Sequence, residues 1–143
     1  MCGIIQLTLA EGSTFMAKLL ILIPAITAVL YILYLCGILE IGTKRALVFI
    51  GSKGTRRRAA KFTSCSGSIK CIVRFPSEGA HNFRLNSTLS KGTLTIELLN
   101  KNKEPLFTLS ESGSAKASLK AKMPYYLITS FNSATGEYEL TWD

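Results

Sequence analysis

The chain has 143 residues, 48% of them hydrophobic, and a formal net charge of +8. Its length leaves room for about one domain with a single core. One histidine and nine acidic residues give little material for a metal centre or a catalytic cluster, so we expect no enzyme, no cofactor and no metal.

Residues 1–18 are predicted as an N-terminal tail. Met16 and Lys18 give a short basic start that leads directly into an apolar run, as in secretory signals and signal anchors. Translation could therefore begin at Met16, which would leave most of this tail untranslated.

Residues 19–39 read LLILIPAITAVLYILYLCGIL and contain no charged residue. As a helix they would be about 31 Å long, which matches the hydrocarbon core of a bilayer. A cleaved signal peptide has a shorter apolar core and a cleavage site of small residues, which Leu33–Gly37 does not provide. The pattern predicts one uncleaved transmembrane helix.

Residues 40–61 are predicted as a basic juxtamembrane linker, within which residues 46–51 could form a first strand. The linker carries seven basic residues and no acidic residue after Glu40: Lys44, Arg45, Lys53, Arg56, Arg57, Arg58 and Lys61. Beside a membrane, these charges indicate contact with anionic lipid head groups or an anionic envelope polymer, and a nucleic acid is the less expected partner. The alternative is a solvated linker whose charges set the membrane topology.

The orientation of the chain in the membrane has two opposed indications. The excess of basic residues after the apolar run places the C-terminal part in the cytoplasm by the positive-inside rule. A start at Met16 and the β character of the remaining chain favour the outside. We expect the C-terminal domain to be extracytoplasmic.

Residues 62–143 alternate apolar and polar positions in short runs about ten residues apart. Turn residues separate these runs at 76–79, 91–92, 100–105 and 132–136. This spacing predicts an all-β domain, a small antiparallel β sandwich or jelly roll. In the last run Tyr138, Leu140 and Trp142 are expected to face the core, and Glu137 and Glu139 the solvent.

Two cysteines of the β domain form a candidate pair. Cys65 and Cys71 flank Ser66-Gly67-Ser68, so they could face each other across a tight hairpin and form a disulfide. Two thiols in a reducing compartment fit the same sequence.

Four aromatic residues could form a surface on which a sugar stacks: Tyr125, Tyr126, Tyr138 and Trp142. The alternative is that they divide between the core and scattered surface positions. Glu137 and Glu139 share one strand face, and we expect them to be solvent-facing carboxylates rather than a catalytic pair.

Three segments carry a family resemblance: Gly92–Ile96, Pro124–Ile128 and Ala134–Leu140. Their order resembles that of bacterial pre-peptidase C-terminal domains, which are small extracellular jelly-roll modules. The resemblance implies a jelly-roll fold and an extracytoplasmic position. Those domains often hold calcium with an aspartate-rich strand, but the matching residues 95–100 contain no aspartate, so we expect no calcium site.

These observations lead to one hypothesis and one alternative. The hypothesis is a single-pass, membrane-anchored, non-catalytic β-sandwich module at the cell surface, which binds an unknown protein or glycan. The alternative is an inward-facing structural or regulatory membrane protein that binds anionic lipid through the basic linker.

Overall fold

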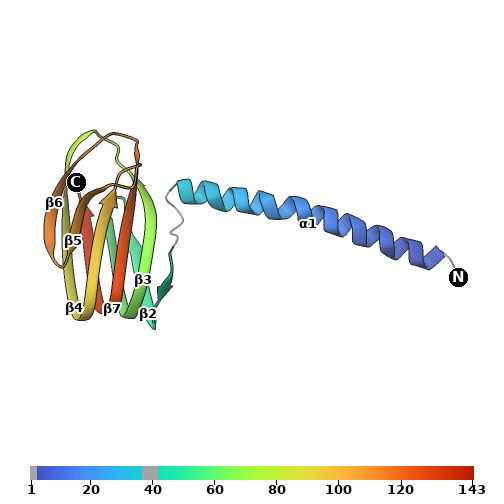
Figure 1. Ribbon diagram of the computed structural model, residues 1–143, viewed down its shortest axis with the longest axis horizontal. Coiled ribbons are helices and arrows are strands. Elements are labelled where there is room, and N and C mark those ends of the chain that lie inside the picture. Colours follow the sequence, from blue (N-terminus) through green and yellow to red (C-terminus); the bar gives the residue numbers. More distant parts are fainter. Residues whose placement is uncertain (1–2, 37–41) are drawn as a thin grey trace. The chain divides into compact units, whose positions relative to one another are not determined.

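The computed structural model describes residues 3–36 and 42–143. These described residues fall into two compact units, which divide between residues 39 and 40. The first unit contains one helix, α1 (Gly3–Leu35), with Pro24 inside it. The second unit contains the strands (Figure 1).

The predicted transmembrane helix over residues 19–39 is not supported. In the part of the chain that the structure describes, no helix is long and apolar enough to cross a membrane. The helix ends at Leu35, and residues 37–41 of the predicted span and linker lie outside the described residues.

The described residues of the second unit form seven strands, all in antiparallel pairs. They are β1 (Lys44–Arg45), β2 (Val48–Lys53), β3 (Arg57–Arg74), β4 (Gly79–Leu99), β5 (Pro105–Ser110), β6 (Gly113–Leu119) and β7 (Pro124–Trp142). The predicted all-β antiparallel class is therefore confirmed for this unit.

Three strands are long enough to serve two layers of the sandwich. The first layer contains one half of each of the long strands β3, β7 and β4, together with β2 and β6. Its strand order is β2-β3-β7-β4-β6. The second layer contains the other halves of these three strands, together with β1 and β5. Its strand order is β1-β3-β7-β4-β5. The long strands bend between the layers, so the core lies between two halves of the same strands (Figure 1).

The bends coincide with breaks in strand register. The pairing of β3 with β7 shifts between Phe62 and Gly67, and that of β4 with β7 shifts between Leu89 and Thr93. Gly136 lies at the bend of β7 with φ +149°, and a Cβ there would lie 2.1 Å from the Thr88 carbonyl oxygen. Only glycine fits such a close backbone approach.

Several residues that were predicted to reverse the chain direction instead lie at bends within continuous strands. Residues 66–68, 91–92 and 132–136 were expected to end strands, but β3, β4 and β7 continue through them. The same residue types favour hairpin turns and β-bulges, because both need polar residues and positive φ. The strands at 79–99 and 124–142 are thus single, bent elements.

The core is built from alternate residues of both layers. Its largest fully buried side chains are Phe83, Leu85, Leu94, Ile96, Leu98, Leu119, Leu140 and Cys65. An aromatic group joins the layers near the bend: the ring centres of Phe62 and Phe131 are 4.9 Å apart, and Phe49 of β2 lies edge-on to Phe131 at 6.0 Å. Phe49 ties the edge strand β2 to this core.

The predicted linker is part of the sheet. Of residues 40–61, those in β1, β2 and the start of β3 are paired strands, and β2 and β3 form a hairpin in which Val48 pairs with Thr63 and Lys53 with Arg58. The strands of this unit therefore begin before the predicted boundary at residue 62. Basic residues do not exclude a strand, because a sheet face exposed to solvent accommodates lysine and arginine.

Candidate functional site

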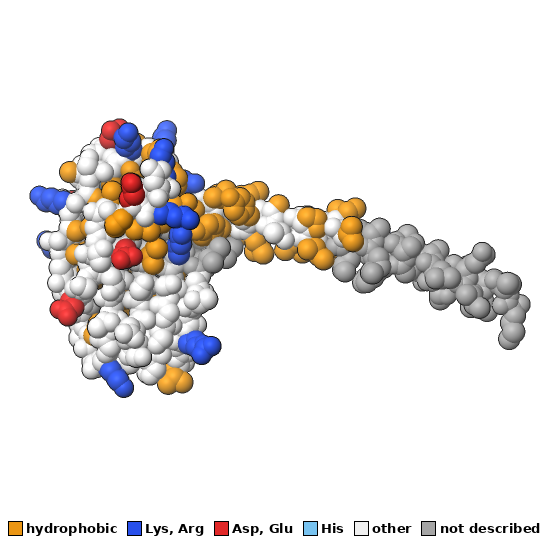
Figure 2. All heavy atoms as spheres, viewed as in Figure 1, with side chains coloured by type: hydrophobic (Ala, Val, Ile, Leu, Met, Phe, Trp, Pro, Cys, Tyr) orange, Lys and Arg blue, Asp and Glu red, His pale blue; other side chains and the backbone are white. Residues whose placement is uncertain are grey.

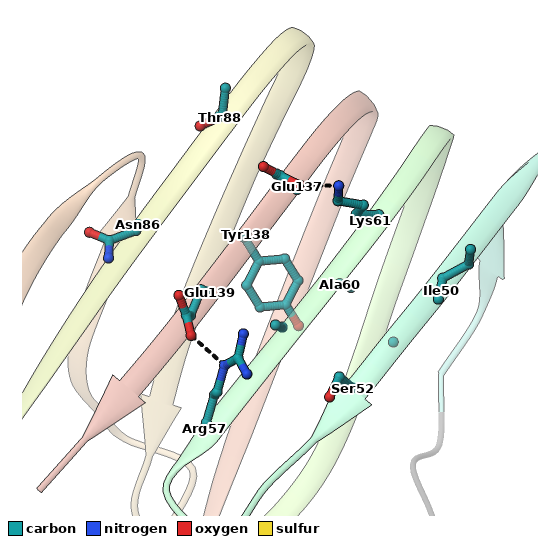
Figure 3. Close-up of a pocket in the computed structure, with 12 residues that line it drawn as sticks. Ile50, Ser52, Arg57, Ala60, Lys61, Asn86, Thr88, Glu137, Tyr138 and Glu139 are labelled. Carbon is teal, nitrogen blue, oxygen red and sulfur yellow. Dashed lines mark ion pairs between the residues drawn. The ribbon is translucent and has the colours of Figure 1, made fainter.

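The outer face of the first layer carries a grid of polar side chains drawn from four strands. One cross-strand row runs through Ile50, Lys61, Glu137 and Thr88. The next row runs through Ser52, Ala59, Glu139 and Asn86. Segments far apart in the sequence, from β3, β7 and β4, thus lie side by side, as Figure 3 shows for the labelled members of both rows.

Two ion pairs cross this face between β3 and β7. Lys61 Nζ lies 2.9 Å from Glu137 Oε2, and Arg57 Nε is paired with Glu139 Oε1 (Figure 3). All four side chains are exposed, so each pair adds at most about 1 kcal/mol to stability. The two pairs also match each positive charge of this face with a carboxylate.

A hollow of about 380 Å³ lies over these rows. Its lining residues are Ile50, Gly51, Ser52, Arg57, Ala59, Ala60, Lys61, Asn86, Thr88, Glu137, Tyr138 and Glu139. A second, more open hollow of about 560 Å³ shares four of these residues and continues past Val48, Leu89 and Thr135. We call the two together the outer groove.

The basic residues of the predicted linker have different surroundings in the structure, and anion binding by them stays a prediction. Arg57 and Lys61 are ion-paired in the outer groove, and Lys44 Nζ lies 3.6 Å from the centre of the Phe49 ring. Arg58 points to the core side of β3 and is only 8% exposed. Figure 2 shows lysine and arginine side chains spread over the visible face of the β domain. The remaining members, Arg45, Lys53 and Arg56, are exposed.

The predicted Cys65–Cys71 disulfide is not formed in the structure. Both residues lie on the single strand β3, which continues through the expected hairpin with a shift of register at Cys65, and both side chains are buried free thiols. Without a hairpin, the two cysteines do not face each other across a pair of strands. Burial raises the pKa of the Cys65 thiol, and the nearby Lys44 partly opposes this.

The four predicted aromatic residues do not form one ligand surface. Tyr125 and Tyr138 are buried in the core, and Trp142 packs against Phe75 and Phe83. Tyr126 lies on the outer face of the second layer, where Lys70 Nζ is 4.5 Å from its ring centre. The alternative, a division between core and surface, is what the structure shows. The inward orientation expected for Tyr138 and Leu140 is confirmed.

The outer groove contains residues that the sequence did not single out as a site, Ser52, Asn86 and Thr88. Each is the polar member of an alternating strand, which is the ordinary pattern of a solvated sheet face. Their convergence depends on the register between β2, β3, β7 and β4, which no local pattern specifies.

Comparisons with known proteins place the chain in no family. No family model matches it, and no curated protein matches it. The resemblance to pre-peptidase C-terminal domains is therefore not shown. The last segment of that resemblance, Ala134–Leu140, lies within the continuous strand β7.

Among solved structures, the chain is similar to several β-rich modules. A CBM4 structure is 5% identical, with 71% of this chain and 76% of that one covered and a TM-score of 0.45. A CBM29-2 mutant of a family 29 carbohydrate binding module, complexed with cellulohexaose, is 11% identical over 71% and 76%, with a TM-score of 0.38. The Yersinia pseudotuberculosis-derived mitogen is 15% identical over 71% and 86%, with a TM-score of 0.45. These scores are too low to assign a family or a ligand.

Proposed function

We propose that the β domain is a non-catalytic binding module that holds a neutral glycan in the outer groove. The observation that carries the proposal is the composition of this groove: an open face of mixed apolar and polar lining whose charged groups balance. It is lined by two basic and two acidic side chains, so its formal charge is zero.

Balanced charge favours a neutral polar ligand over an anionic one. An anionic polymer would need unmatched positive charge, and here Arg57 and Lys61 are matched by Glu139 and Glu137. Sugar hydroxyls both donate and accept hydrogen bonds. The carboxylates of the groove accept, its cations donate, and the Asn86 amide does both.

The shape of the groove also suits a chain-like ligand. The two hollows share Ile50, Lys61, Thr88 and Glu137, so they lie end to end across the face. Val48 and Ile50 supply apolar surface at one side, against which the C–H face of a sugar ring can pack. No aromatic platform is required for this mode.

The proposal assigns no catalytic role to the two carboxylates. Glu137 and Glu139 are each held in an ion pair, as expected of solvent-facing residues on a strand. An extracytoplasmic location of the domain stays a proposal that fits a glycan ligand, and protease accessibility in intact cells tests it.

Affinity electrophoresis tests the proposal directly. The chain is run through native gels that contain one neutral polysaccharide each, such as a β-glucan, a mannan or a xylan, and through gels with an anionic one. We expect retardation by at least one neutral polysaccharide. Replacing Asn86 by Ala should weaken it about tenfold, because about 1.4 kcal/mol of hydrogen bonding is removed.

Thr108→Ala is the matched control, because Thr108 is an exposed strand residue of β5 outside the groove. Its retardation should equal that of the unmodified chain. Retardation in the anionic gel alone, or neutral binding that Asn86→Ala leaves intact, would show that the groove is not the glycan site.

A further inference from the structure

A third hollow lies apart from the outer groove, where two connections between strands meet. Its volume is about 260 Å³, and none of its lining residues lines the outer groove. Residues of the connection from β4 to β5, 100–104, and of the connection from β6 to β7, 120–123, both contribute to it. We call this hollow the end pocket.

Hydrogen bonds within the first connection fix its shape. Asn100 Oδ1 accepts bonds from the N–H groups of Asn102 at 2.8 Å and Glu104 at 3.0 Å. Asn100 Nδ2 donates to Glu104 Oε2 at 2.7 Å. An asparagine side chain that bonds to the backbone a few residues on holds a turn in one conformation. The backbone of Lys101, which lies inside this turn, is therefore held in place.

The second connection is held by bonds to residues of two strands. Lys120 N–H donates to the Tyr125 hydroxyl at 2.8 Å, and Lys122 N–H donates to the Phe75 carbonyl oxygen at 2.9 Å. Because the Tyr125 hydroxyl accepts the first of these bonds, its own proton can be donated to a ligand in the end pocket.

Part of the lining of the end pocket is apolar. Leu106, Met123, Pro124 and the ring of Tyr125 supply this surface, and Leu106 is 37% exposed. An apolar lining with a few polar groups is the usual composition of a small-molecule site. A cavity of about 150 Å³ is enough to hold benzene. The end pocket therefore has room for an apolar body of that size and for a polar group attached to it.

The charge of the end pocket is positive and is not balanced. Lys101 and Lys120 line it, and no acidic residue of the described chain does. Residues 98–110 contain one acidic residue, Glu104, which is bonded to Asn100, and residues 112–136 contain none. In the outer groove, by contrast, each cation is paired with a carboxylate. The end pocket therefore complements an anion rather than a neutral sugar.

We propose that the end pocket binds a small organic acid, a carboxylate attached to an apolar body about the size of a benzene ring. The carboxylate is held by the ammonium groups of Lys101 and Lys120. The apolar body packs against Leu106, Met123 and Pro124. This site is separate from the proposed glycan site, because the two share no lining residue.

Ligand-observed NMR titration of the full chain tests the proposal. The probe is 3-phenylpropanoate. Its amide, 3-phenylpropanamide, has nearly the same shape without the charge, and propanoate has the charge without the ring. We expect saturable binding of 3-phenylpropanoate with a Kd in about the millimolar range, and at least about tenfold weaker binding of the other two.

Each other result of this titration would overturn the proposal. Equal binding of the amide would show that the lysines do not select a carboxylate. Equal binding of propanoate would show charge attraction without a pocket for the apolar body. A lack of binding by 3-phenylpropanoate would show that the end pocket does not take this class of acid.

A pair of double variants locates the bound acid. Lys101→Gln with Lys120→Gln removes both charges of the end pocket and should weaken binding of 3-phenylpropanoate at least about tenfold. Lys91→Gln with Lys116→Gln is the matched control, because it removes two exposed lysines that line none of the three hollows. Equal binding by the two double variants would overturn the proposed site.

A cross-check separates this proposal from glycan binding. The Lys101→Gln, Lys120→Gln variant should keep any polysaccharide retardation, and Asn86→Ala should keep the binding of 3-phenylpropanoate. Loss of 3-phenylpropanoate binding in Asn86→Ala would place the acid in the outer groove and overturn the assignment to the end pocket. Failure of polysaccharide retardation alone would contradict only the proposed function.

Discussion

Asp143 fastens the end of β7 to β4 through its own side chain. Its Oδ1 accepts a hydrogen bond from Asn82 N–H at 2.7 Å, and its Oδ2 accepts one from Asn82 Nδ2 at 2.7 Å. These bonds, first that of the Asn82 side chain and then that of its backbone, lower the pKa of the Asp143 carboxyl. The buried His81 adds a contact at this corner, with Nδ1 2.5 Å from the Asp143 carbonyl oxygen.

The hydrogen bonds of the Asp143 carboxylate predict that the folded chain loses stability in acid. Because the pKa of Asp143 is lower in the folded chain than in the unfolded one, its contribution is complete above the unfolded value of about 3.9. This contribution of Asp143 to stability is then lost as the pH falls through the pKa of Asp143 in the folded chain. Asp143→Asn should therefore lower the thermal unfolding midpoint at pH 7, and its midpoint should fall less steeply below about pH 4.

Circular dichroism melts between pH 2.5 and 7 check this prediction, on a pH scale that brackets the ordinary carboxyl value of about 3.9. Glu78→Gln, at an exposed turn, is the control and should follow the unmodified chain. A variant Asp143→Asn with the unmodified acid profile would contradict the assignment.

At the scale of the elements, the decisive feature is that three long strands each serve both layers. Their bends require backbone conformations and approaches that side chains obstruct. At Gly136, φ is +149° and the space for a Cβ is filled by backbone of β4. The bend of β7 therefore requires glycine at position 136.

Gly136→Ala should lower the free energy of unfolding by about 2–3 kcal/mol or more, because it adds both backbone strain and a steric clash. Urea unfolding followed by tryptophan fluorescence of Trp142 measures the change. Gly113→Ala is the matched control: a Cβ at Gly113 would lie 3.7 Å from Leu109 Cδ2, an ordinary contact. Equal stability of the two variants would contradict the role of the bend.

At the scale of the whole molecule, the chain divides into two units, and the core belongs to one of them. The core cluster in the described chain extends from Ala60 to Leu140, all within residues 40–143. Phe49 of β2 packs against this cluster. Folding of the β domain should therefore depend on β2 and not on residues 1–39.

Two deletions test this division. Removing residues 1–39 should change the unfolding midpoint of the β domain by less than about 3 °C, because no core side chain is lost. Removing residues 1–53 should lower it by more than about 5 °C, because Phe49 leaves its contacts with Phe62 and Phe131. Similar midpoints for the two deletions would contradict this view.

The sequence by itself determined the class of the β domain and the direction of many side chains. Alternation in residues 62–143 predicted an antiparallel β domain, and the run 137–142 correctly placed Tyr138 and Leu140 in the core. These are local properties, because the period of two is set by the geometry of a single strand.

Only the tertiary structure decided which strands continue and which residues meet. Gly92 and Gly136 mark bends rather than chain reversals, and the Cys65–Cys71 spacing measures distance along one strand rather than across two. The outer groove likewise joins Ser52, Ala59, Glu139 and Asn86 in one row. That row exists because distant segments share a register, and register is fixed by burial of the whole core rather than by any short stretch of sequence.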